Sequence, residues 1–181
     1  MVDQLTLQTI GILLTGLTVS IAAIYYMLTL RYTRRNQELT LKAQEQALET
    51  RQAQLFMQVY DRFTSYEFKK AYTDVLYNWS WTDHDDLVSK YGPQNVEEYS
   101  KFDMIGTFFE GVGVLVKRGL IDPLFVDDLM SGHVVRTWEL FSSWVYIERE
   151  RQNYPQLSEW FEYLYDQIKP IVEEQHPELK T

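Results

Sequence analysis

The sequence of 181 residues contains no cysteine. Disulfide bonds, thiolate metal sites, cysteine nucleophiles and iron–sulfur clusters are therefore excluded together, because each requires a cysteine sulfur. Histidine is also scarce, with three residues in the chain. A metal site would have to use His, Asp and Glu, and neither His-Glu-x-x-His nor a repeated Glu-x-x-His pattern occurs. The sequence therefore predicts no metal site and no cofactor.

Motifs that bind phosphate groups or carry nucleophiles are missing too. The chain contains no Gly-x-x-x-x-Gly-Lys-Ser/Thr, no Gly-x-Gly-x-x-Gly and no Gly-x-Ser-x-Gly. Basic residues are outnumbered, with 17 Lys and Arg against 26 Asp and Glu and a net charge of −9. Because binding to nucleic acid requires clustered cations, this balance argues against a nucleic-acid partner.

Turn-forming residues are few, with 8 Gly and 5 Pro, and neither occurs between Leu17 and Tyr91. An all-β chain would need a turn signal roughly every 8–12 residues. Apolar residues instead recur at three and four residues, which is the helical period. We therefore predict an all-α protein in which an N-terminal transmembrane helix continues into a long stalk helix and a C-terminal bundle of four to six helices.

The segment from Gln4 to Leu30 is the longest run without a charged residue, 27 residues in all. About 20 apolar residues suffice to cross a bilayer. A cleaved signal peptide is the alternative, but it needs a basic start and a shorter apolar run, and the only charge before the segment is Asp3. We therefore predict an uncleaved single-pass anchor in the cytoplasmic membrane.

Positive charges follow this segment directly, at Arg31, Arg34 and Arg35. The excess of Lys and Arg on the cytoplasmic side of membrane proteins then predicts an outside N-terminus and a cytoplasmic C-terminal domain. Residues 31–55 carry a net charge of +2 and residues 61–181 a net charge of −10. We expect the basic flank to lie on anionic lipid headgroups.

Small residues recur at four-residue spacing within the apolar segment, as Gly11 with Thr15 and Gly16 with Ser20. Such spacing lets two helices approach closely in lipid, which favours an oligomer or docking against a larger membrane protein. The alternative is that Gly, Ser and Thr are simply common in membrane helices.

The chain is divided into an anchor with its basic flank (1–35), a helical stalk (36–58), a helical bundle (59–175) and a tail (176–181). The stalk has a leucine every seventh residue, but the partner positions of that heptad are polar, so a coiled-coil seam is incomplete. One helix is predicted from about Thr6 through Trp79, roughly 110 Å at 1.5 Å per residue.

Cap residues predict further helix ends in the bundle. Thr82 or Asp83 starts a short helix, and Gly119 ends a helix that runs from about Val96 to Arg118. Gly106, Gly111 and Gly113 lie within that helix, where each costs about 1 kcal/mol relative to Ala, so we expect close helix packing there.

Asp122-Pro123 is a start signal for the next helix. The pattern predicts a short helix over Leu124–Met130, a separate helix after Ser131-Gly132 that ends near Arg151, and a last helix over Gln156–Glu174 that Pro170 kinks or ends.

Glu110 is the acidic residue with the most apolar surroundings, in Phe-Phe-Glu-Gly-Val-Gly. It is predicted either to be a structural anchor, paired with Arg136 or capped by backbone amides, or to be a functional acid with a raised pKa. An enzymatic alternative combines Glu110 and Asp122 with Arg136 or His133. His84, in Thr-Asp-His-Asp-Asp, is expected in a solvated acidic turn, and His176 in the tail.

The stretch Phe108-Phe-Glu-Gly-Val-Gly-Val-Leu-Val-Lys-Arg-Gly-Leu-Ile-Asp122, with Trp138 sixteen residues later, resembles an uncharacterised family of short prokaryotic membrane proteins. That family combines one N-terminal span with a helical cytoplasmic domain. The resemblance implies that Glu110, Gly113, Gly119 and Asp122 are signature positions, and it implies no activity.

The leading hypothesis is a membrane-anchored, non-enzymatic interaction protein, either an accessory subunit of a membrane complex or a homo-oligomer. A membrane sensor that transmits a signal through the long helix is the alternative, and a carboxylate-based enzyme is less favoured. The expected partners are membrane lipid and copies of the chain or a larger membrane complex.

Overall fold

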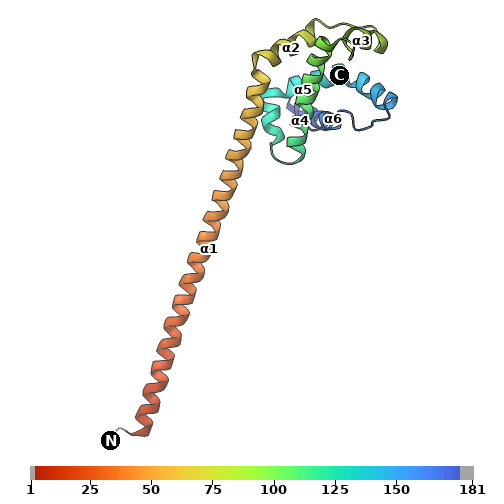
Figure 1. Ribbon diagram of the computed structural model, residues 1–181. Helices are drawn as coiled ribbons and strands as arrows, with labels where there is room; N and C mark the ends of the chain where they lie inside the picture. Colours follow the sequence, from red (N-terminus) through yellow and green to blue (C-terminus); the bar gives the residue numbers. More distant parts are fainter. Residues whose placement is uncertain (1–2, 176–181) are drawn as a thin grey trace. The chain divides into compact units, whose positions relative to one another are not determined.

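A computed structural model describes residues 3–175, in which all regular secondary structure is helical (Figure 1). The all-α prediction is thereby confirmed, while the predicted tail and His176 lie outside the described residues. The contacts divide the chain into a first unit that ends at Glu49 and a second that begins at Thr50. The helices are α1 (Gln4–Thr64), α2 (Tyr66–Tyr77), α3 (His84–Tyr91), α4 (Val96–Lys117), α5 (Pro123–Arg151) and α6 (Glu159–Gln175).

Helix α1 passes without interruption through the Arg-rich flank, as predicted, but it ends at Thr64 and not near Trp79. Ser65 leaves the helical conformation, and its side chain accepts a hydrogen bond from the Phe68 amide at 3.4 Å, so it caps α2. The break places the rings of Phe63 and Phe68 5.4 Å apart, and both are buried. Aromatic packing therefore ends α1 in a part of the sequence that contains neither Gly nor Pro.

In the first unit, every described residue is exposed. Helix α1 is long and apolar enough to cross a membrane, by length and composition. Exposed large apolar side chains follow one another closely from Leu5 to Leu30 and recur more sparsely beyond, as at Leu39, Leu41 and Leu48.

The core of the second unit is formed by the end of α1 and by α2, α4, α5 and α6. Helix α6 packs on α4 and on α5, while α2 and α3 each contact α4. The core is rich in aromatic rings, whose burial and edge or stacked contacts stabilise it. Its buried rings are Phe56, Phe63, Phe68, Tyr72, Phe109, Trp138, Phe141 and Phe161.

Helix α5 is a single element, so the predicted break after Ser131-Gly132 is wrong. Val126, Met130, Val134 and Trp138 follow one another at four-residue spacing, and all are buried. This apolar stripe continues across the glycine. Burial of such side chains contributes about 1.5–3 kcal/mol each, which outweighs the helix cost of about 1 kcal/mol for a glycine.

Helix α6 begins three residues later than predicted, and Pro170 lies inside it without ending it. Ile168 is buried before the proline, and Val172 packs against the core after it. Contacts on both sides of Pro170 therefore hold the helix through to Gln175.

Candidate functional site

The Glu110 carboxylate of α4 lies at the first turn of α6. It accepts hydrogen bonds from the backbone amides of Phe161 at 2.8 Å and Trp160 at 3.3 Å. These amides have no partner within their own helix, and the positive end of the helix dipole favours a carboxylate there. Glu110 thus performs for α6 the role that an N-cap side chain normally has, but from a different helix. The prediction that backbone amides cap Glu110 is confirmed.

The alternative pairing of Glu110 with Arg136 is wrong. Arg136 donates a hydrogen bond to the Tyr77 hydroxyl at 3.1 Å, and its guanidinium lies over the Tyr77 ring, 4.8 Å from the centroid. Helix α2 therefore supplies the partner for Arg136. Burial raises the pKa of Glu110 above its ordinary value, and the two backbone amides oppose that rise.

Gly113 lies one turn further along α4, next to the backbone of α6 at Trp160. A Cβ atom at this position would overlap with the backbone carbonyl of Trp160. Gly106 and Gly111 have no such neighbour within 4 Å. The expected close packing is therefore confirmed at Gly113 and is wrong at the other two positions.

Gly119 and Asp122 form the turn between α4 and α5. Gly119 has a φ of 66°, a left-handed conformation that glycine adopts without the Cβ penalty, and the Asp122 side chain accepts a hydrogen bond from the Leu124 amide at 2.9 Å. Trp138 is buried, with its ring centroid 5.1 Å from that of Phe161. Glu110, Gly113, Gly119, Asp122 and Trp138 therefore act on helix ends and helix packing.

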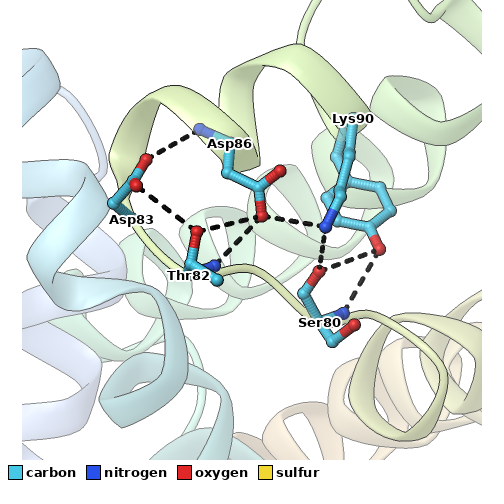
Figure 2. A network of polar contacts seen from close by, with 6 residues as sticks. Ser80, Thr82, Asp83, Asp86 and Lys90 are labelled. Atoms are coloured by element: carbon cyan, nitrogen blue, oxygen red, sulfur yellow. Dashed lines mark hydrogen bonds and ion pairs between the residues drawn. The ribbon is translucent and has the colours of Figure 1, made fainter.

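The start of α3 is held by a network of polar contacts, which Figure 2 shows. Asp83 accepts from the Asp86 amide at 2.9 Å, and Asp86 accepts from the Thr82 amide at 3.0 Å and from Lys90 at 2.8 Å. Lys90 also donates to the Ser80 carbonyl at 3.1 Å. The network ties α3 to the segment before it, and the Asp83 cap confirms the predicted start of this helix.

Beside this network lies a partly enclosed cavity of about 140 Å³, which we call the aromatic cavity. Helices α3, α4 and α5 and the segments that flank α3 contribute to its wall. The Trp79 and Tyr91 rings stack at 3.8 Å, and Phe102 meets Trp144 edge to face at 4.6 Å. The residues that line the cavity are Trp79, Leu87, Val88, Tyr91, Gly92, Pro93, Tyr99, Phe102, Trp144, Glu148, Gln152 and Leu157.

His84 lies next to the cavity wall, and its expected place in a solvated turn is wrong. Its Nε2 atom is 3.0 Å from the Glu148 carboxylate, and the His84 side chain is 14% exposed. No group of three or more His, Asp and Glu side chains that could hold a metal ion occurs among residues 3–175.

A family model matches residues 10–168 of the chain. The protein belongs to the family described as Domain of unknown function (DUF4760). No curated protein and no solved structure matches the chain. The resemblance to an uncharacterised family is thus confirmed.

The enzymatic alternative would require Glu110 and Asp122 to come together with either Arg136 or His133. Glu110 binds the start of α6, Asp122 caps α5, Arg136 binds Tyr77, and His133 Nδ1 lies 3.0 Å from the Tyr72 hydroxyl. No hydrogen bond or ion pair joins any two of Glu110, Asp122, His133 and Arg136 within residues 3–175. The structure therefore does not assemble the site that this alternative requires.

His133 is half-buried and belongs to a separate group of polar side chains with the buried Tyr72 and Thr137. The Tyr72 hydroxyl that it contacts is also 3.2 Å from the Thr137 hydroxyl. Burial, with the nearby positive charges of Lys69 and Arg136, lowers the pKa of His133. The lowered pKa favours the neutral imidazole, and the hydrogen bonds among His133, Tyr72 and Thr137 link α2 to α5.

Replacing Glu110 with alanine is expected to reduce the free energy of unfolding by about 1–2 kcal/mol, because two amides at the start of α6 lose their acceptor. Chemical denaturation of the full chain in detergent, followed by tryptophan fluorescence, measures this. Glu150→Ala is the control, since that side chain is exposed on α5 and should change stability by less than about 0.5 kcal/mol. Equal losses in both variants would contradict a capping role.

The raised pKa of Glu110 adds a pH dependence to this prediction. The folded state binds the carboxyl proton of Glu110 more tightly than the unfolded chain does. The contribution of this group to the free energy of unfolding therefore falls as the pH rises, through a range that begins near the ordinary pKa of 4.5. Glu110→Gln removes that fall. The free energy of unfolding of Glu110→Gln, measured relative to that of wild type, should therefore be higher at pH 7 than at pH 4.

Proposed function

We propose that this DUF4760 protein is a membrane-anchored, non-enzymatic interaction protein that acts as an accessory subunit of a membrane complex or as a homo-oligomer. The observation that carries the proposal is the first unit of the chain. A helical run of 27 uncharged residues, Gln4 to Leu30, has no side chain buried in the protein. Such an apolar surface needs lipid or a protein partner to cover it.

The hydroxyl groups of this run are compatible with lipid as its surroundings. Each of five hydroxyl side chains donates a hydrogen bond to the carbonyl four residues earlier, at 2.8 to 2.9 Å. A polar group in hydrocarbon must find its partner within the protein, and these bonds satisfy that requirement inside one helix. The five residues are Thr9, Thr15, Thr18, Ser20 and Thr29.

The distribution of charge supports a cytoplasmic second unit. Arg31, Arg34 and Arg35 follow the apolar run, and all three are exposed. Their charge favours the anionic cytoplasmic leaflet. The net charge of −10 on residues 61–181 favours a position away from the lipid surface.

The part of α1 that follows the basic flank supports an interaction role. It is helical, yet Leu39, Leu41 and Leu48 are each more than half exposed. An isolated polar helix is marginally stable in water, so contact with a neighbour that covers these leucines would stabilise it. The small-residue positions Gly11, Thr15, Gly16 and Ser20 offer a second contact face within lipid.

Substitution at the centre of the span tests the anchor. Leu14→Lys is expected to disfavour membrane insertion by about 2.5–3.5 kcal/mol, because lysine at the bilayer centre is costly. Leu41→Lys adds the same charge outside the span and should leave insertion unchanged. Carbonate extraction of membranes measures insertion, and reporter fusions at each terminus measure orientation. Release of the wild-type chain by carbonate would overturn the anchor.

Association is tested separately, by cross-linking in membranes and native mass spectrometry in detergent. The proposal expects a homo-oligomer or a defined complex with another membrane protein. An isolated monomer with no co-purifying partner in both measurements would overturn it.

A membrane sensor is the second candidate, because α1 is one helix that contains both the apolar run and the buried Phe56 and Phe63 of the second unit. Replacing residues 4–30 with an unrelated apolar helix discriminates between the two. An accessory subunit would retain contacts made by its second unit, whereas a sensor would retain those contacts and lose its response to the membrane.

A further inference from the structure

The aromatic cavity has no part in the function proposed above. Five of the residues that line it carry aromatic rings, and they come from helices and turns far apart in the sequence. They are Trp79, Tyr91, Tyr99, Phe102 and Trp144. The face of an aromatic ring is negative, so rings whose faces are turned toward a cavity favour a cation, above all an alkylated ammonium group.

The cavity wall carries a negative charge, which is the sign that attracts a cation. Glu148 is the only Asp, Glu, Lys, Arg or His side chain among the residues that line the cavity. Its own partners are His84 at 3.0 Å, Gln152 at 2.6 Å and the exposed Arg151 at 3.7 Å. Among the residues that the structure describes, only the Gln152 amide donates a hydrogen bond to the carboxylate, while His84 and Arg151 lie near its other oxygen without a hydrogen bond to it. Glu148 therefore faces the cavity as a negative charge that is held in place by Gln152.

A quaternary ammonium group has no N–H to donate. It is stabilised by diffuse charge and by ring faces, and therefore does not require a free carboxylate lone pair. Negative charge near the cavity also affects Tyr99. Burial is the largest cause of the raised pKa of its phenol, and the carboxylates of Asp103 and Glu148 raise this pKa further.

The size of the cavity and one buried donor limit the ligand further. A cavity of about 150 Å³ accommodates a molecule of the size of benzene, so the 140 Å³ here suits a head as small as tetramethylammonium or choline. The indole N–H of Trp144 is buried and has no hydrogen-bond partner among the residues that the structure describes. An oxygen on the ligand, such as the choline hydroxyl, would be an acceptor of the kind that this N–H needs.

We propose that the aromatic cavity binds a small quaternary ammonium group, from a free compound or from a lipid headgroup, with the rings as its cage and Glu148 as its counter-charge. Binding of a free quaternary ammonium compound at this site does not depend on the membrane anchor. The proposal of this site can therefore be confirmed or overturned whatever the outcome of the anchor and association experiments.

The test compares choline with 3,3-dimethylbutan-1-ol, which has the same shape and no charge. Both are titrated into the full chain in maltoside detergent by calorimetry, with saturation-transfer NMR on the ligand methyl groups. The cation is expected to bind at least about tenfold more tightly than its neutral counterpart. Equal binding, tighter binding of the neutral alcohol or no binding of either compound would overturn the proposal.

Two variants on α5 test whether Glu148 supplies the negative charge that attracts choline. Glu148→Gln is expected to reduce choline affinity by about tenfold and to leave binding of the neutral alcohol unchanged, which also shows that the cavity is intact. Glu139→Gln makes the same change at a half-exposed position that pairs with Lys169, and should leave choline affinity unchanged. Choline affinity that is lost equally in both variants, or in neither, would overturn the role of Glu148.

If Glu148→Gln abolishes binding of both ligands, a second variant with a smaller aromatic ring in the cage tests the proposal. Trp144→Phe retains a ring but removes the indole donor. It should weaken choline more than tetramethylammonium, which has no oxygen. The same loss for both cations would contradict the contact between Trp144 and a ligand oxygen.

Nanodiscs distinguish the two sources of the ligand. Free choline is titrated into the chain in phosphatidylcholine discs and in phosphatidylglycerol discs. Weaker binding in phosphatidylcholine identifies the lipid headgroup as occupant, and equal binding identifies a free compound. Both results support the quaternary ammonium site, and absence of choline binding in both discs overturns it.

Discussion

Replacing Trp138 with alanine is expected to reduce the free energy of unfolding by about 3–5 kcal/mol, the cost of removing a large aromatic side chain from a packed core. Trp138 is 2% exposed. Its ring lies 5.1 Å from Phe161 and 6.1 Å from Tyr165, so it joins α5 to α6. The same loss would weaken the packing that holds the first turn of α6 near Glu110. Denaturation of the full chain in detergent, followed by near-ultraviolet circular dichroism, measures the effect.

Tyr66→Ala is the control for this large aromatic truncation. Tyr66 is 77% exposed at the start of α2, so its removal leaves no cavity and should change stability by less than about 0.5 kcal/mol. A Trp138→Ala variant as stable as Tyr66→Ala would show that α5 and α6 do not pack through this ring.

Replacing Gly113 with alanine is expected to cost up to about 3 kcal/mol, the upper end of the range for overpacking. The added methyl group would overlap with the backbone carbonyl of Trp160, and a backbone atom cannot move aside as a side chain can. Helices α4 and α6 would have to separate, and the amides that Glu110 caps would move with α6. Thermal and chemical denaturation measure the loss, and quenching of tryptophan fluorescence reports the separation.

Gly111→Ala is the matched control on the same helix. It has open space at the Cβ position, so the higher helix propensity of alanine should raise stability by about 0.5–1 kcal/mol. The two substitutions are chemically identical and two residues apart, yet their expected effects have opposite signs. Two changes of the same sign would contradict the close approach of α4 and α6 at Gly113.

Local signals in the sequence determined much of the fold. The uncharged run from Gln4 to Leu30, the Asp83 and Asp122 caps and the left-handed Gly119 were all visible in the sequence, because each acts on its own helix or turn. Such local effects require no knowledge of distant contacts. The helical class and most helix ends follow from them.

Contacts between distant residues determined what the sequence could not show. Helix α1 ends at Thr64 because Phe63 and Phe68 pack together, and α5 continues through Ser131-Gly132 because a buried stripe crosses it. Both outcomes reverse a local preference worth about 1 kcal/mol through core packing worth several times more.

The candidate sites were also determined by contacts between distant residues. The sequence marked Glu110 as unusual, but its acceptor role required α6 to begin about fifty residues later at that very place. The aromatic cavity had no sequence signal, since its rings come from segments with no common spacing and its single carboxylate lies on α5. By itself the sequence determined which segments are helical and which are apolar, because those properties depend on neighbours along the chain. Only the tertiary structure decided which side chains meet, because burial and hydrogen bonding between helices depend on neighbours in space.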